Sequence, residues 1–473
     1  MVTLQSRWLR AGTAGVLTNL RRRWGSWRLP IPIKVAVIGV SLLGGYAWHT
    51  QVNPKIRHYW WSNRSAKIAK QKFGLDGDLC HFYGEKGGVD SDLQNIRRAA
   101  KARVESDEVD PSFAMHWETG AWLRYGNVLW RVGYFPSSRL PCDDPLPAAC
   151  DRGWCLVILP GNDRGLEMAQ RMSEVTDGRF EVKDSSDRPS MNPDGESLLS
   201  RLDLVGFGIL GQSKICLDRF IDFIFAMFSG GAKTPQTVPH TDGCPLVVFL
   251  PSFAEHYASR QVPMSLTLAS RGICGMILIE NPLRGRRAPP PSMSLHAECM
   301  HSVDQFLAFA ARSVSDTRGL LHWIDSKIRP DRLCVGGLSI GASIATMSAV
   351  TLRNLAAGLS LCAFFPASSA SSTWTHERSA MRPYVNPKLD RGYIEEATAA
   401  TDITTYPMPT TLSGNSSRVE LLGARHDAII LGENTRRLSE YLGCPIRWVR
   451  GGHVTGALLQ QHEFIQAITR AVS

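Results

Sequence analysis

Three residues in the second half of the chain have the types and the order that nucleophilic acyl transfer requires. Ser339 is the middle residue of Gly-Leu-Ser-Ile-Gly at 337–341, which follows an apolar run and opens a helical pattern. A glycine on each side permits the sharp strand-to-helix turn that exposes a nucleophilic hydroxyl. Asp427 and His453 each follow a later predicted strand. The alternative interpretation of Ser339 is an ordinary helix-capping serine in a glycine-rich turn.

The spacing of the three residues predicts how they would act together. A serine hydroxyl is hardly ionised near neutral pH, so it needs a base, and the base needs a carboxylate that fixes its tautomer. The order Ser339, Asp427, His453 is the one found in hydrolases built on a doubly wound sheet. We therefore predict these three as a catalytic triad, with Glu420 and Glu433 as the rival acids.

Such a triad also needs two main-chain N–H donors for the oxyanion that forms during acyl transfer. One donor is expected from Ile340, the residue after the serine. The other should come from the loop that follows the predicted strand 246–250. Phe253 is the predicted donor there, and Ser252 and Ala254 are the alternatives.

The cysteines give no sign of a disulfide scaffold or a zinc module. The chain has 11 cysteines, and no two of them form a C-x-x-C pair. We therefore expect no metal and no cofactor.

Short apolar runs alternate with helical patterns, which predicts parallel strands joined by crossover helices. One such helix is indicated by apolar residues at helical spacing between Val303 and Ile324. The predicted fold class is therefore α/β, with a mostly parallel sheet and helices on both faces. The predicted strands are 154–160, 246–250, 275–279, 333–336, 359–364, 419–422 and 446–449.

The rest of the chain divides into an arm, a body and an insertion. Residues 1–75 form the predicted arm, and 76–473 the predicted hydrolase-like body. Within the body, 161–243 is rich in Asp, Ser, Gly and Pro apart from one apolar run, and we interpret it as an inserted loop or cap.

Positive charge is concentrated in the arm. The formal net charge is +10, but residues 1–75 hold 13 Lys and Arg and no acidic residue, which leaves 40 basic against 43 acidic residues beyond. A basic groove for nucleic acid is therefore excluded, and no nucleic-acid partner is expected. An Arg-rich, acid-free start is typical of a mitochondrial transit peptide. A basic cytosolic tail is the alternative.

An apolar segment follows the first arginines. Val35–Trp48 carries no charge, and with its flanks from 29 to 52 it is long enough for a candidate membrane segment. Trp60 and Trp61 suit a membrane interface, and the nearby lysines and arginines suit anionic lipid. The sequence predicts a mitochondrial, membrane-associated protein. A signal-peptide-like segment or a helix buried on the body is the alternative.

Four motifs together resemble a known family, the α/β-hydrolase-domain-containing-18 proteins. They are Leu278-Ile279-Glu280-Asn281-Pro282 followed by Gly285 and Arg287, Leu320-Leu321-His322-Trp323-Ile324, the pentapeptide around Ser339, and Gly451-Gly452-His453. The resemblance covers roughly residues 132–160 and 244–473. It implies a serine hydrolase that is linked to mitochondria and removes acyl chains from cardiolipin, a phospholipid.

The sequence departs from that family at Pro251–His256, where the family has a glycine-rich turn. Side chains crowd this turn, so three functions stay open. The first is a membrane-associated lipase acting on phospholipid esters, the second an acyl-protein thioesterase, and the third a catalytically silent scaffold. The Glu280-Asn281-Pro282 segment is interpreted as structural, with Glu280 holding Arg284 or Arg287.

Overall fold

The computed structural model describes the body of the chain in several stretches. The chain divides into two units, Met1–Leu75 and Asp76–Ser473. The predicted arm, its apolar segment and Phe253 lie outside the described residues, as does most of the predicted insertion. The described residues are 91–106, 113–141, 144–185, 243–252, 261–287, 303–352, 355, 358–376, 391–409, 412 and 418–473.

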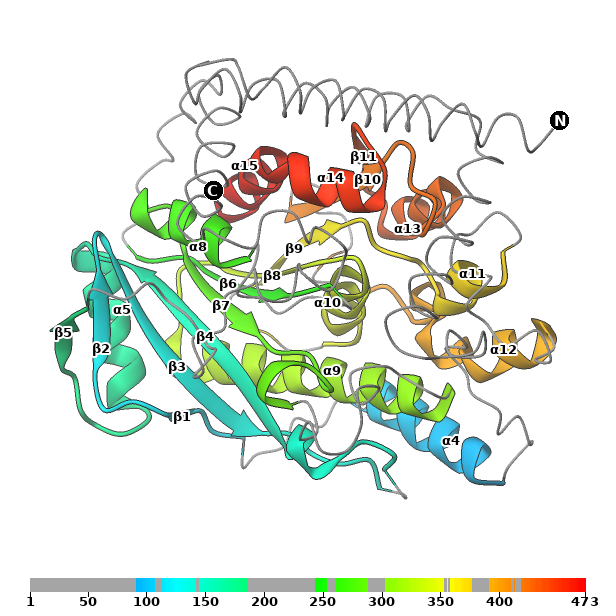
Figure 1. The fold of residues 1–473 in the computed structure, drawn as a ribbon, viewed down its shortest axis with the longest axis horizontal. Helices are drawn as coiled ribbons and strands as arrows, with labels where there is room; N and C mark the ends of the chain where they lie inside the picture. Colours follow the sequence, from blue (N-terminus) through cyan, green and yellow to red (C-terminus); the bar gives the residue numbers. More distant parts are fainter. Residues whose placement is uncertain are drawn as a thin grey trace, which may run out of the picture. The chain divides into compact units, whose positions relative to one another are not determined.

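One mixed sheet forms the centre of this part of the chain (Figure 1). Its strand order is β11-β10-β9-β8-β6-β7-β4-β3-β2-β5, with β1 paired to β3. The strands from β11 to β7 are parallel, β4, β3, β2 and β1 pair in antiparallel fashion, and β5 is parallel to β2. The strands are β1 His116–Trp117, β2 Trp122–Tyr125, β3 Val128–Pro136, β4 Arg152–Pro160, β5 Val182–Asp184, β6 Leu246–Leu250, β7 Gly275–Ile279, β8 Leu333–Leu338, β9 Leu359–Phe364, β10 Val419–Ala424 and β11 Ile446–Val449.

Burial on both faces explains why the central strands are continuous apolar runs. All residues of β6, β7, β8 and β9 are buried. Alternate residues of β8 enter two different cores, Leu333 and Val335 on one face and Cys334 and Leu338 on the other. A parallel strand covered on both faces needs apolar side chains in both directions.

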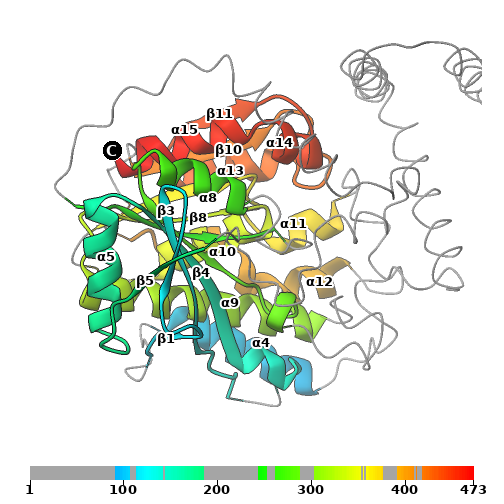
Figure 2. The ribbon, with the colours of Figure 1, turned by 60° about the vertical axis from the view of Figure 1, so that its left-hand side comes forward.

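Helices cover the two faces of the sheet (Figure 2). The core on one face includes residues of α4, α5, α9, α10 and α13, and the core on the other face includes residues of α8, α14 and α15. Figure 1 shows α8, α14 and α15 above the sheet and α4 and α9 below it. The longer helices are α4 Ser91–Glu105, α5 Asp163–Glu174, α8 Gln261–Ser270, α9 Val303–Trp323, α10 Ile340–Thr351, α13 Gly432–Leu442, α14 His453–Leu459 and α15 Gln461–Val472.

Between β9 and β10 the chain leaves the sheet. It forms short helices there, which Figure 1 shows beyond the carboxyl end of β9. They are α11 Ala370–Thr375, α12 Arg391–Ala397, η7 Ala399–Thr401 and η8 Ile403–Thr405. The remaining short turns are η1 Ala148–Asp151, η3 Gly285–Arg287 and the π-helical η5 Ile324–Ile328.

The predicted fold class is confirmed, with corrections at the start of the body. Strands 246–250, 275–279, 359–364 and 446–449 have the predicted bounds. The first part of the predicted insertion, 161–185, is helix α5 and strand β5, because Asn162 caps α5 and β5 extends the sheet beside β2. The part of the insertion from 186 to 242 lies outside the described residues.

Two further properties concern the described residues alone. No helix among them combines the length and apolar character needed to cross a membrane. Their seven cysteines are buried and make no disulfide with one another. Burial raises the pKa of Cys155 to about 12 and that of Cys244 to about 11, so these thiols are protonated near neutral pH.

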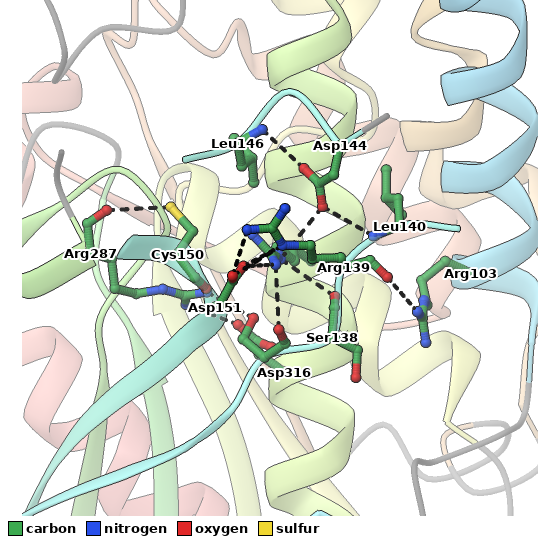
Figure 3. A network of polar contacts seen from close by, with 12 residues as sticks. Arg103, Ser138, Arg139, Leu140, Asp144, Leu146, Cys150, Asp151, Arg287 and Asp316 are labelled. Carbon is green, nitrogen blue, oxygen red and sulfur yellow. Dashed lines mark hydrogen bonds and ion pairs between the residues drawn. The ribbon is translucent and has the colours of Figure 1, made fainter. Parts of the chain in front are cut away.

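A buried ionic network fastens α9 to the loops before β4 and after β7 (Figure 3). The Arg287 side chain has no exposed surface, and its Nη1 lies 2.9 Å from Asp316 Oδ2. Its guanidinium donates to Ser137 Oγ and to the main-chain oxygens of Cys150 and Glu280. The loop that follows β7 is therefore fixed at several points.

Arg312 extends the same network on α9. Its Nη2 donates to Asp151 Oδ1 over 2.7 Å, and Arg139 binds the same carboxylate from the solvent side. Burial opposes ionisation of Asp151, but the hydrogen bonds from Arg139 and Arg312 outweigh it and lower the pKa of Asp151. The carboxylate therefore stays charged, as the buried arginine requires.

Candidate active site

Ser339 sits in the sharp turn between β8 and α10. Its backbone has φ 58° and ψ −122°, a conformation that side chains rarely adopt. The Ser339 N–H donates to the Phe364 oxygen over 2.8 Å, and the Ser339 oxygen accepts from Ala342 and Ser343. The strained turn is thus fixed by the neighbouring strand β9 and by the first turn of α10.

The two glycines of the pentapeptide are explained by close backbone contacts. A Cβ on Gly337 would lie 2.4 Å from the carbonyl of Gly341, and a Cβ on Gly341 would lie 2.4 Å from the Pro251 oxygen. Any larger residue would therefore push α10 away from β8 or away from the turn after β6. Glycine is therefore required at both positions by close packing as well as by the backbone conformation of the turn.

His453 is hydrogen-bonded to both other predicted triad members. Its Nε2 lies 2.8 Å from Ser339 Oγ, and its Nδ1 lies 2.7 Å from Asp427 Oδ2. Since a carboxylate only accepts, Nδ1 carries the proton, and Nε2 is left with a lone pair facing the serine hydroxyl. This is the tautomer in which a histidine can take a proton from serine.

The Asp427 carboxylate is held by the backbone of its own loop. Oδ1 accepts from the N–H groups of Ile429 and Ile430, each over 2.8 Å, which leaves Oδ2 directed at His453. The Asp427 side chain is 2% exposed, against 13% for His453. Both carboxylate oxygens are therefore hydrogen-bonded, and the carboxylate cannot turn away from the imidazole without breaking main-chain hydrogen bonds.

The two rival acids are engaged elsewhere. Glu420 accepts from Nε and Nη2 of Arg470, each over 2.8 Å, in a bidentate ion pair. Glu433 Oε2 lies 3.6 Å from Nε2 of His376. Asp427 is the carboxylate that lies against His453.

Phe365 supports the site, and sequence reasoning did not single it out. It follows β9 with a φ of 58°, and its N–H donates to the Leu422 oxygen over 2.8 Å. Its buried ring lies 5.8 Å from the His453 imidazole, and a Cβ on Gly456 would lie 2.9 Å from that ring. Phe365 thus forms a wall beside the histidine. The only signal in the sequence is an aromatic residue directly after a predicted strand.

One predicted oxyanion donor is placed by the structure and the other is not. Ile340 begins α10, so its N–H has no acceptor within the helix and is available next to Ser339. Phe253 lies outside the described residues, but Pro251 and Ser252 before it are described. The Pro251 oxygen is packed against Gly341, which brings the turn after β6 to the serine.

A second contact holds that turn, and sequence reasoning missed it. Asn281 is fully buried two residues after the end of β7, and its Nδ2 donates to the Pro251 oxygen over 3.1 Å. Glu280 is predicted to hold Arg284 or Arg287. Its main-chain oxygen accepts from Arg287, whereas its carboxylate Oε2 accepts from the main-chain N–H of Arg286. No local pattern links Asn281 to Pro251, since they follow two neighbouring strands, β7 and β6.

The described residues contain no group of three or more His, Cys, Asp or Glu side chains that could hold a metal ion.

Comparison with known families identifies the chain. The family model described as "Alpha/beta hydrolase domain containing 18" matches residues 231–388 and 385–473. The chain belongs to this family. The alpha/beta hydrolase domain containing 18 proteins are α/β-hydrolases, and the mixed sheet with helices on both faces is the fold of that class. The suspected resemblance is confirmed for the carboxyl-terminal region, whereas its part at 132–160 lies outside the matched residues.

Several solved structures are similar to the chain at low identity. Acetyl xylan esterase 1 from Thermoanaerobacterium sp. JW/SL YS485 is 10% identical, with a TM-score of 0.39 over 82% of this chain and 99% of that one. An esterase from Thermogutta terrifontis is 13% identical, with a TM-score of 0.32 over 50% and 83%. A putative hydrolase from Agrobacterium vitis S4 is 14% identical, with a TM-score of 0.36 over 50% and 91%. Comparison with curated proteins gives no match.

Proposed function

We propose that the chain is a serine hydrolase that cleaves acyl esters through Ser339, His453 and Asp427. The observation that carries the proposal is the continuous pair of hydrogen bonds, 2.8 Å from Ser339 to His453 and 2.7 Å from His453 to Asp427. The strained serine turn and the half-buried first residue of α10 add to it. Together they supply a nucleophile, a base in the required tautomer, and one oxyanion donor.

The reaction follows from this geometry in two halves. Ser339 Oγ attacks the ester carbonyl carbon while its proton moves to His453 Nε2, and the carbonyl oxygen takes the negative charge beside the Ile340 N–H. The carbon–oxygen bond to the alcohol breaks, and the alcohol leaves with the proton from His453. Water then attacks the acyl-serine in the same way, which releases the carboxylic acid and restores Ser339.

As substrate we propose the acyl esters of phospholipids, with mitochondrial cardiolipin as the first candidate. The support is the family to which the chain belongs and the basic, acid-free arm of 75 residues, which suits an anionic membrane. No metal or cofactor enters the reaction as proposed.

Labelling with a fluorophosphonate probe tests the enzyme class, because only an activated serine reacts. We expect labelling of the full-length protein, followed by hydrolysis of phospholipid esters and not of S-acylated proteins. Absence of labelling would favour the catalytically silent scaffold. Turnover of thioesters without turnover of phospholipids would favour the thioesterase.

The contact between Asn281 and Pro251 gives a prediction about the turn that follows β6. Asn281→Leu is expected to lower kcat by about 10- to 100-fold with KM little changed, because the turn predicted to carry the second oxyanion donor loses its hydrogen bond from Asn281. The measurement is steady-state kinetics on a water-soluble ester.

The matched control for that variant is Asn127→Leu. Asn127 Nδ2 donates to the Ser270 oxygen over 3.0 Å, so the same kind of bond is lost at the opposite edge of the sheet. This variant should keep a normal kcat. Equal losses of kcat in the two variants would mean that Asn281 affects only folding.

The predicted location is tested through the arm. Deletion of residues 1–30 should misroute the protein, because the cationic start is what directs import. Deletion of 31–62 should leave it imported but extractable by alkaline carbonate, because the apolar segment and the interfacial tryptophans are lost.

Fractionation of cells with detection of the protein is the measurement for these deletions. Full-length Ser339→Ala serves as the control, since its arm is intact and its location should not depend on activity. Full-length protein found soluble in the cytosol would contradict the location and would make cardiolipin an unsuitable substrate.

A further inference from the structure

Three aromatic side chains lie in a row across the first strands of the sheet. His116 on β1 is directly opposite Tyr134 on β3, and Tyr134 is directly opposite Trp154 on β4. The ring centroids are 5.3 Å apart at both steps. His116 is exposed, and Tyr134 and Trp154 are half-buried. We call these three residues the aromatic row.

Two arginines lie on the aromatic row. The guanidinium of Arg152 is 5.2 Å from the Tyr134 ring, and that of Arg286 is 4.6 Å from the Trp154 ring. Arg286 is paired with Glu118, whereas no carboxylate among the described residues lies within ion-pair distance of the exposed Arg152. Stacking on a ring leaves the edge of a guanidinium able to donate to another ligand.

The aromatic row lies at the same edge of the sheet as Ser339. Strand β4 begins beside the end of β7, where Cys155 is opposite Ile279 and the Glu280 N–H donates to the Trp154 oxygen. The parallel strands β7, β6 and β8 end at that edge, and Ser339 follows β8. Three strand spacings of about 4.8 Å separate β4 from β8, or about 14 Å.

We propose that the aromatic row, with Arg152 and Arg286, is a surface that rests on the head groups of an anionic phospholipid membrane. Tyrosine and tryptophan prefer the membrane interface because one part of each ring is apolar and another part polar. Arg152, which has no carboxylate partner among the described residues, matches the phosphate charge. A membrane bound here lies about three strand spacings from β8, at the edge where Ser339 follows that strand, so phospholipid has only a short path to the serine. The proposal rests on the proposed function and adds the surface through which the protein contacts the membrane that contains its substrate.

The test uses the full-length protein and two substrates. One is a water-soluble ester, p-nitrophenyl butyrate, and the other is phosphatidylcholine vesicles with or without cardiolipin. The test variant is Arg152→Glu. Its matched control is Arg271→Glu, an exposed arginine in the turn before β7 and therefore at the opposite edge.

Arg152→Glu is expected to lower hydrolysis of the cardiolipin-containing vesicles by about tenfold or more, with unchanged hydrolysis of the soluble ester. Arg271→Glu should match the original protein on both substrates. Equal effects of the two variants on vesicles would overturn the proposal, as would a parallel loss on the soluble ester. Loss of activity on S-acylated proteins alone would assign the surface to a protein partner and also overturn it.

A second readout does not depend on activity. Hydroxyl-radical footprinting of the full-length protein should show less oxidation of Tyr134 and Trp154 when cardiolipin-containing vesicles are added. Tyr125, at the opposite edge of the same sheet, is the internal control and should not change. Protection without hydrolysis would refute the proposed function and support the surface. Hydrolysis without protection would refute the surface alone.

Discussion

Ser339→Ala is expected to abolish ester hydrolysis, with a loss of about 10³-fold or more in kcat. The reason is the loss of the hydroxyl that lies 2.8 Å from His453 Nε2, so no acyl-enzyme can form. The backbone of the turn is held by main-chain hydrogen bonds to β9 and α10, which alanine keeps. Kinetics on a soluble ester, fluorophosphonate labelling and a thermal melt measure activity, reactivity and folding separately.

A second serine, in the first turn of α10, provides the control for that experiment. Ser343 Oγ accepts from the Ala367 N–H over 3.0 Å and donates to the Ala367 oxygen over 3.2 Å, and it bonds to neither His453 nor Asp427. Ser343→Ala should therefore lower stability by about 1 kcal/mol and leave labelling in place. Undiminished turnover by Ser339→Ala would show that Ser339 is not the nucleophile.

The site was predictable where the chemistry depends on local sequence. Gly337 is required by its close contact with Gly341 inside the turn, so the pentapeptide alone predicts the turn. Strand 246–250 was predictable because burial on both faces leaves no place for a polar residue. The positions of Asp427 and His453 after strands then follow from the rule that parallel strands end at one edge.

Strands β1, β2 and β3 could not be predicted from a local apolar pattern. Strand β3 carries Arg131 in its middle, which breaks the apolar pattern. The structure buries this residue completely, with its guanidinium bound to the Thr119 oxygen and to Asp177. Burial lowers the pKa of Arg131, and the hydrogen bond to Asp177 opposes that shift. Partners distant in sequence therefore decide whether an arginine can lie in a core, and the sequence alone does not show them.

The residues that hold the site in place could not be predicted for the same reason, because their partners are distant in sequence. Asn281 reaches Pro251 from the neighbouring strand, and Phe365 reaches His453 from the end of β9. The first contact depends on β6 and β7 being neighbours, and the second on β9 lying two strands from β11. Neither pairing of strands can be read from a local pattern in the chain. Residues that act through such contacts become visible only after the fold is known.

Asp427→Asn is expected to lower kcat by about 10³- to 10⁴-fold, close to the effect of His453→Ala. The amide oxygen can keep the bonds from the Ile429 and Ile430 N–H groups, which places the NH₂ group against His453 Nδ1. That group donates, so Nδ1 must give up its proton and Nε2 must carry it. The imidazole then donates toward Ser339 and cannot take its proton.

Two matched variants test this argument, because each makes the same change of carboxylate to amide at a rival acid. Glu420→Gln weakens the ion pair with Arg470, and Glu433→Gln changes the group beside His376, but neither touches His453. Both should retain kcat, and Glu420→Gln should lose only stability. If Asp427→Asn keeps its activity while Glu433→Gln loses it, Glu433 is the acid that orients the histidine. If all three variants stay active, His453 needs no carboxylate to fix its tautomer. Steady-state kinetics with a thermal melt on each variant separates these outcomes.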